Sequence, residues 1–125
     1  MPRILVVDDD PVLRKAVRRM LEPEGFEIEE AEDGRDGLRR FRARPADLAL
    51  CDLFMPERDG LEFLRELSRE FVGGKVVTMS GGNGHGTVDL LPLAKFLGAD
   101  GTLYKPFKQA DLLKAIRHVL SSIPN

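Results

Sequence analysis

Acidic, hydroxyl and amino side chains follow short apolar runs at four places in this 125-residue sequence. Asp8 and Asp9 follow one such run, and Asp52, Ser80 and Lys105 each follow another. Carboxylates that lie close together cannot all stay ionised without a compensating charge. The ammonium group of Lys105 is one suitable compensator. Mg²⁺, which favours one or two carboxylates together with water and phosphate oxygens, is another.

This set of groups fits phosphoryl transfer to a carboxylate. An aspartate can attack phosphorus and form an acyl phosphate. A metal ion and Lys105 would neutralise charge on the phosphoryl oxygens during transfer, and the Ser80 hydroxyl could hydrogen-bond the phosphoryl group once it is attached. No histidine follows any of these apolar runs as a general base, which disfavours hydrolysis at a carbon centre.

The elements that must position these residues alternate between strand and helix. Five short apolar runs predict strands, at residues 4–7, 26–31, 47–51, 75–79 and 102–104. Amphipathic segments between and after them predict helices, which begin at Pro11 and Gly34 and cover 61–71, 88–97 and 110–120. Asp10 is the expected N-cap of the first helix, and Gly25 its expected end.

Strands that alternate with helices imply parallel strands joined by right-handed crossovers, and therefore a three-layer α/β fold. The alternating pattern of residues 26–31 predicts a strand near an edge of the sheet. In an open parallel sheet, ligands bind beyond the carboxyl ends of the strands. The residues that follow the strands should therefore share one edge of the sheet.

Four motifs resemble the receiver domain of two-component response regulators, the CheY-like family. In chain order they are ILVVDDDPVLRKAV, LCDLFMPERDG, VVTMSG and GADGTLYKPF, and the resemblance runs from Arg3 to about Ser122. It implies a flavodoxin-like (βα)5 fold, a doubly wound parallel five-stranded sheet with strand order 2-1-3-4-5. We expect residues 1–125 to form one response-regulator receiver domain.

The resemblance also implies which residues bind Mg²⁺. Asp9 would be a direct ligand and Asp8 would act through water. Asp52 and the backbone carbonyl of Phe54 would complete the protein ligands. Asp10 has no clear family role and is assigned to helix capping.

A second set of roles implied by the resemblance concerns the phosphoryl group. Asp52 would accept it, and Ser80 and Lys105 would contact it. Pro106 follows Lys105 in what the family usually holds as a cis peptide.

The sequence departs from the family at the residues that couple phosphorylation to a conformational change. Family members normally have Tyr or Phe three residues before the lysine, whereas this chain has Thr102. Tyr104 lies two residues later and should share the strand face of Thr102. The switch set is therefore Ser80, Thr102 and Tyr104, with the partner of Ser80 left open.

Two further departures concern the surroundings of Asp52 and Ser80. Phe54 stands where a polar residue is more common, and its bulk should slow hydrolysis of the acyl phosphate. The glycine-rich stretch GGNGHG follows Ser80, and we expect it to become ordered on phosphorylation.

The composition excludes several classes of function. Lys plus Arg number 19 and Asp plus Glu 21, so the net charge of -2 gives no general field for nucleic acid or anionic membranes. Cys51, the only cysteine, excludes an internal disulfide. No apolar run approaches the roughly 18 residues of a membrane span. We expect a cytoplasmic domain with no membrane insertion and no direct nucleic-acid binding.

The first helix carries basic residues opposite its apolar stripe. They are Arg14, Lys15, Arg18 and Arg19. We interpret them as a solvated helix face, with docking of a partner protein as the alternative.

The function implied by the resemblance is a phosphorylation-dependent signalling switch. A sensor histidine kinase or a phosphotransfer protein would phosphorylate Asp52, and the modified domain would bind a downstream target or output domain differently. Such a domain assists its own phosphorylation and autodephosphorylation but is not a metabolic enzyme.

Three alternatives belong to other classes. An aspartate-nucleophile phosphatase usually has a second Asp two residues after the first, where this chain has Phe54. A phosphate-binding P-loop needs a lysine directly before its Ser or Thr, but Gly86 precedes Thr87. A degenerate receiver that acts only as a phosphorylation-independent protein-interaction module is favoured by Thr102 alone.

Overall fold

The computed structural model describes residues 1–55, 59–81 and 91–121. In this part of the chain, strands and helices alternate. The strands are β1 (Arg3–Val7), β2 (Glu27–Ala31), β3 (Leu48–Asp52), β4 (Val76–Gly81) and β5 (Gly101–Lys105). The helices are α1 (Pro11–Leu21), η1 (a 3-10 turn, Glu22–Glu24), α2 (Gly34–Ala43), α3 (Asp59–Glu70), α4 (Leu91–Phe96) and α5 (Gln109–Leu120).

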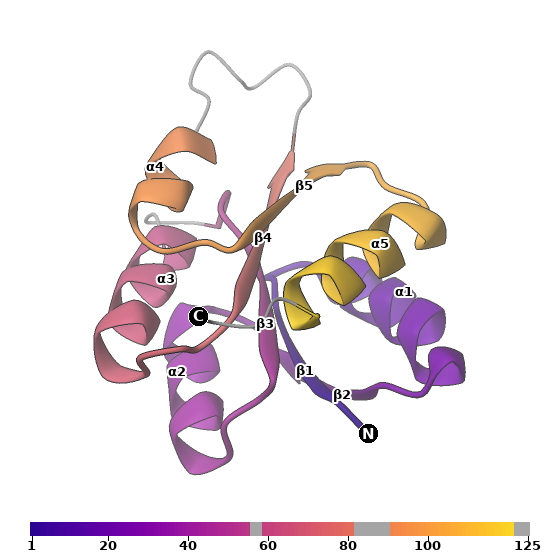
Figure 1. The fold of residues 1–125 in the computed structure, drawn as a ribbon, viewed down its shortest axis with the longest axis horizontal. Coiled ribbons are helices and arrows are strands. Elements are labelled where there is room, and N and C mark those ends of the chain that lie inside the picture. The colour runs from indigo at the N-terminus through magenta and orange to yellow at the C-terminus, as the bar shows by residue number, and fades with distance from the viewer. Residues whose placement is uncertain (56–58, 82–90, 122–125) are drawn as a thin grey trace.

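The strands form one parallel sheet in the order β2-β1-β3-β4-β5. Helices α1 and α5 cover one face of the sheet, and α2, α3 and α4 cover the other (Figure 1). This is the doubly wound α/β fold with the predicted strand order. The expectation that the second strand lies at an edge is confirmed as well.

Each face of the sheet has its own apolar core, and the residues of β1 serve both. Leu5 and Val7 pack in the layer of α2 and α3, whereas Ile4 and Val6 pack in the layer of α1 and α5. A strand with two buried faces needs apolar side chains at every position. This explains why the run before Asp8 is continuous rather than alternating.

Asp10 caps α1, as predicted, because its side chain accepts a hydrogen bond from the backbone N–H of Val12 at 2.9 Å. The predicted end of this helix at Gly25 is wrong. The α-helix ends at Leu21 and the chain tightens into η1 before Gly25 adopts a left-handed φ of 93°. A glycine signals where a helical segment must stop, but not where the α-helical part gives way to a tighter turn.

Strands β3 and β4 extend one and two residues further than predicted. Asp52 and Ser80 are thus the last and the second-to-last residues of these strands, not residues beyond them. The stretch GGNGHG lies outside the described residues apart from Gly81, so its predicted ordering stays a prediction. The described part of the fourth helix, Leu91–Phe96, falls inside the predicted range.

Candidate functional site

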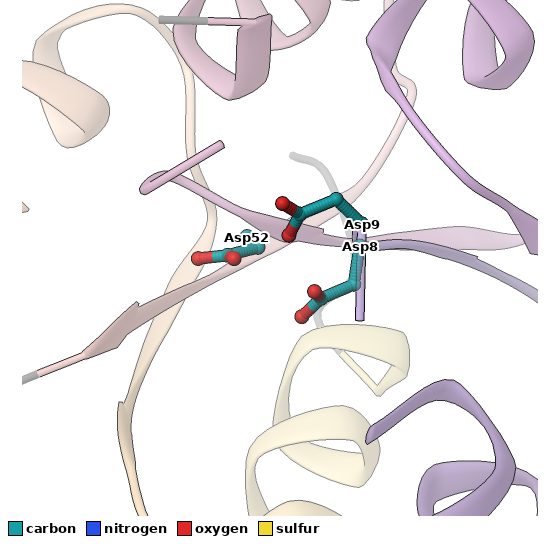
Figure 2. Close-up of side chains that lie close together, drawn as sticks. All are labelled: Asp8, Asp9 and Asp52. Carbon is teal, nitrogen blue, oxygen red and sulfur yellow. The ribbon is translucent and has the colours of Figure 1, made fainter. Parts of the chain in front are cut away.

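Three acidic residues meet at the carboxyl edge of the sheet. Each of Asp8, Asp9 and Asp52 offers a carboxylate oxygen, and these oxygens all lie within 4.8 Å of one another. Figure 2 shows the three side chains gathered where β1 and β3 end. Asp8 and Asp52 are buried, while Asp9 is exposed. An open but mostly buried group of hard oxygen donors suits a divalent cation such as Mg²⁺.

The pairing of β1 with β3 explains why Asp8 and Asp52 lie together. Val7 of β1 is in register with Cys51 of β3, and an aspartate directly follows each of these two residues. Cys51 itself is fully buried, as expected for a small core residue. The close approach of these two carboxylates therefore follows from strand register.

Lys105 brings a positive charge to this group from β5. Its Nζ lies 3.0 Å from Oδ2 of Asp8 and 3.2 Å from Oδ2 of Asp52. Strand β5 pairs with β4, not with β1 or β3, so the lysine reaches across the edge of the sheet. One ammonium group faces three carboxylates, which leaves an excess of negative charge for a cation to neutralise.

The pKa of Asp8 is raised chiefly because its carboxyl group is buried. Burial raises this pKa to about 6, and the nearby charge of Asp52 acts in the same direction. The hydrogen bond from the N–H of Asp10 and the contact with Lys105 both act to lower the pKa, but they do not outweigh burial. Burial also disfavours the charged form of Lys105, but the two carboxylates outweigh burial and hold its pKa above the usual value. Both shifts describe a pocket that favours additional positive charge.

Two backbone features hold Asp52 in place. The N–H of Phe54 donates a hydrogen bond to Oδ1 of Asp52 at 3.0 Å. The backbone of Gly60, in the first turn of α3, approaches so closely that an added Cβ would lie 2.0 Å from the Asp52 carbonyl oxygen. Only glycine fits there, and α3 therefore begins directly against the end of β3.

Ser80 lies on β4, the neighbour of β3, which carries Asp52. Asp52 is in register with Met79, so Ser80 is one residue further toward the carboxyl edge. The Ser80 side chain is buried. On the other side, Ser80 is in register with Tyr104. The serine thus lies between the strand that carries Asp52 and the strand that carries Lys105.

Thr102 and Tyr104 share an exposed face of β5, as predicted. Leu103, between them, packs in the layer of α1 and α5, so its neighbours point to the opposite side of the sheet. Thr102 is in register with Thr78, further from the carboxyl edge than Ser80. Tyr104 is 56% exposed and is the aromatic residue in register with Ser80. The peptide bond that follows Lys105 is cis, as the resemblance implied.

Arg14 was interpreted as part of a solvated helix face, and that interpretation is wrong. Its side chain is 15% exposed and contacts both Glu30 and the backbone carbonyl of Asp8. Lys15 and Arg18 also bind Glu30, whereas Arg19 is exposed. Helical periodicity gives the direction of a side chain but not its partner on another element. The available signal was the run of glutamates in the second strand.

Comparison with known proteins agrees with this architecture. A family model for the response regulator receiver domain matches residues 4–117. The chemotaxis protein CheY of Halobacterium salinarum is 36% identical over 121 residues, which make up 96% of this chain and 98% of that protein. The transcriptional regulatory protein CseB of Streptomyces avermitilis is 35% identical over 117 residues, or 94% of this chain and 48% of that protein.

A solved structure is similar as well. The response regulator receiver domain protein (CheY-like) from Methanospirillum hungatei has a TM-score of 0.87 and 31% identity, covering 96% of this chain and 94% of that chain. The fold and the acidic edge define a doubly wound α/β domain of the CheY-like type. The chain belongs to the response regulator receiver domain family, whose members are signalling domains of two-component systems. It spans about half the length of several curated relatives, CseB among them.

None of the helices in the described ranges is long and apolar enough to cross a membrane.

Proposed function

We propose that this domain is a phosphorylation-controlled switch in which Asp52 accepts a phosphoryl group. The observation that carries the proposal is the pair of contacts from Lys105 to Asp8 and Asp52. They put a fixed cation beside the acceptor carboxylate, within a group of acids that still has excess negative charge. We also propose that residues 1–125 form a single receiver domain.

The proposed metal ligands are those that the family resemblance implies, and the close approach of the three carboxylates supports them. Asp9 and Asp52 would bind Mg²⁺ directly with the Phe54 carbonyl, and Asp8 would bind it through water. The raised pKa of Asp8 supports a cation there, because a nearby positive charge would relieve its cost of ionisation. When bound, Mg²⁺ supplies charge neutralisation for the phosphoryl oxygens.

The chain's own residues have separate roles in the transfer. A carboxylate oxygen of Asp52 attacks phosphorus as the bond from phosphorus to the donor's imidazole nitrogen breaks, and the electron pair of that bond stays on the imidazole. Lys105 is already half-buried and held by two carboxylates, so its ammonium needs little rearrangement to meet the phosphoryl oxygens. The hydrogen bond from Phe54 N–H limits the rotation of the Asp52 side chain.

After transfer, the proposed switch runs through Ser80. Its hydroxyl would donate a hydrogen bond to the phosphoryl group and draw the end of β4 toward Asp52. Tyr104, in register with Ser80, is the aromatic residue placed to follow this movement. Phe54 would shield the acyl phosphate from water and lengthen its lifetime.

The proposed partners are a sensor histidine kinase or phosphotransfer protein as donor, and a downstream target or output domain as receiver of the signal. The relatives are compatible with either form of output, because this chain spans 98% of the chemotaxis protein CheY but 48% of the transcriptional regulatory protein CseB. We propose that the domain works in the cytoplasm, with no direct nucleic-acid binding of its own. It assists its own phosphorylation and autodephosphorylation without being a metabolic enzyme.

The decisive experiment is mass spectrometry of the intact protein after incubation with acetyl phosphate and Mg²⁺. We expect one added phosphoryl group on the wild type, loss of the adduct in EDTA, and no adduct on Asp52→Asn. Asp10→Asn is the matched control, because asparagine still caps α1 and Asp10 is an exposed acid next to the site. No adduct on wild type, under conditions that modify another receiver domain, would overturn the proposal.

The same experiment separates the second candidate function, a degenerate receiver that binds partners without phosphorylation. The observation that favours this candidate is Thr102, which stands at the usual aromatic position and is exposed. A wild-type protein that gains no adduct in this experiment would support the second candidate.

A further inference from the structure

The side chain of Arg14 connects three parts of the molecule. It extends from the first turns of α1, its Nη1 donates a hydrogen bond to the carbonyl oxygen of Asp8 at 2.7 Å, and its Nε contacts Glu30 Oε1 on β2 at 3.1 Å. Arg14 and Glu30 are only 15% and 12% exposed. A guanidinium group held on two sides in this way has little freedom to move.

The carbonyl of Asp8 needs this donor because the sheet ends beside it. The pairing of β1 with β2 ends at Val7 and Ala31, and the N–H of Asp8 donates to the Ala31 carbonyl at 3.1 Å. The Asp8 carbonyl lies beyond the last pair of the ladder, and Arg14 supplies the hydrogen bond there. Because the peptide unit is planar, holding this oxygen also fixes the N–H of Asp9 and the direction in which the chain continues.

Glu30 gives the arginine a firm anchor. It also binds Arg18 at 2.8 Å and Lys15 at 3.1 Å. Burial alone would raise the pKa of Glu30, but the hydrogen bonds from these three basic side chains outweigh it and hold the pKa below its usual value. Glu30 therefore stays ionised at neutral pH, and Arg14 is tied to the sheet rather than to solvent.

We propose that Arg14 is a positioning residue for the Mg²⁺ site, acting through the backbone of Asp8 to place the carboxylate of Asp9. The inference rests on the proposed function, in which Asp9 binds the metal. Asp9 is the exposed member of the acidic group, so its place depends on the backbone that carries it. Arg14 would therefore set the affinity for Mg²⁺ without contacting metal or phosphoryl group.

The matched pair Arg14→Met and Arg18→Met tests this role. Both variants remove an ion pair with Glu30 and keep most of the apolar stem, but only Arg14→Met removes the hydrogen bond to Asp8. The measurement is the Mg²⁺ concentration that gives half the maximal rate of phosphorylation by acetyl phosphate. We expect it to rise roughly three- to tenfold in Arg14→Met, as for the loss of one hydrogen bond, and to change less than about twofold in Arg18→Met.

Two further features separate positioning from general destabilisation. The rate at saturating Mg²⁺ should stay close to wild type in both variants, because the reacting groups are intact. Arg14→Lys should give an intermediate Mg²⁺ requirement, since a single ammonium group cannot reproduce both contacts of the guanidinium.

A metal-independent measurement keeps the inference separate from the proposed function. The N–H of Asp10 donates to Oδ1 of Asp8 at 2.9 Å. Its hydrogen exchange in EDTA, followed by NMR, should accelerate in Arg14→Met and not in Arg18→Met. If wild type shows no Mg²⁺-dependent phosphorylation but this selective acceleration occurs, the proposed function fails and the positioning by Arg14 stands. Equal behaviour of the two variants in both measurements, or a raised Mg²⁺ requirement without faster exchange, would overturn the inference.

Discussion

Ser80 and Tyr104 are register partners on the neighbouring strands β4 and β5. Ser80 is buried, whereas Tyr104 is 56% exposed. Register partners on parallel strands point to the same side of the sheet. A displacement of Ser80 toward Asp52 would therefore change the space available beside the Tyr104 side chain. In this chain, the aromatic residue next to the serine therefore lies two residues after Thr102.

This relationship predicts an optical signal for switching. Tyr104 is the only tyrosine and the sequence contains no tryptophan, so intrinsic fluorescence reports on this position alone. We expect acetyl phosphate and Mg²⁺ to reduce the quenching of Tyr104 by acrylamide, since the ring moves from an exposed to a more covered position. Ser80→Ala should still be phosphorylated but should lose most of this change. A full change in Ser80→Ala would refute the coupling.

The raised pKa of Asp8 predicts that the metal-free protein loses stability as the pH rises. The folded-state pKa of about 6 lies above the usual aspartate value of 3.8, so folding takes up a proton at pH values between the two. Uptake of this proton contributes about 3 kcal/mol to the free energy of unfolding. The contribution is fully present below about pH 4 and is lost as the pH rises through 6. In EDTA at pH 8, Asp8→Asn should therefore unfold at higher urea concentration than wild type.

The gain from Asp8→Asn should disappear near pH 4, where the wild-type carboxyl is already neutral. Asp10→Asn serves as the control, because Asp10 is exposed and asparagine keeps the cap. An Asp8→Asn variant that is less stable than wild type at pH 8 would mean that the contact with Lys105 outweighs the cost of burial.

The close approach of Gly60 to Asp52 predicts a large effect from one added methyl group. Gly60→Ala would place Cβ 2.0 Å from the Asp52 carbonyl oxygen, so either α3 or the end of β3 must shift. We expect a loss of about 3 kcal/mol in the free energy of unfolding, at the upper end for overpacking, together with slower phosphorylation. Gly81→Ala is the control, since no atom of the described residues lies within 4 Å of its Cβ position, and its free energy of unfolding should stay close to wild type.

The side chain of Phe54 predicts a long-lived acyl phosphate. It is 39% exposed and follows Asp52 by two residues, so it can cover the approach of water to the phosphoryl group. Phe54→Asn should accelerate loss of the phosphoryl group severalfold after the donor is removed, with Mg²⁺ affinity almost unchanged because the carbonyl remains. Phe96→Asn, at an exposed apolar residue of α4, should have the wild-type lifetime. An unaltered lifetime in Phe54→Asn would count against shielding.

The alternation of elements and the layers of the fold were predictable, because short stretches of sequence and their order along the chain are enough to indicate them. The unbroken apolar run before Asp8 requires a strand with two buried faces, and alternation of strand and helix requires crossovers between parallel strands. From there, the meeting of Asp8 with Asp52 follows from strand ends that share an edge. The residue types predicted Lys105 as a compensating charge for the acids, but spacing alone could not give its contacts with Asp8 and Asp52, since β5 is two strands away from β3.

The features that were missed depend on contacts between elements. The sequence marks Arg14 as a basic residue on a polar helix face, but its contacts arise only after β2 pairs with β1 and brings Glu30 beside α1. Periodicity describes one element at a time and carries no information on such partners.

The contact of Lys105 with Asp8 joins residues that are 97 positions apart. While a ribosome is still producing the chain, the acids of β1 and β3 emerge long before their lysine does. The proposed acceptor site is therefore complete only after β5 has been added at the open edge of the sheet. A nascent or cleaved fragment that lacks β5 carries Asp52 without its ammonium partner, so the proposed acceptance of a phosphoryl group should arise only once β5 has joined the sheet.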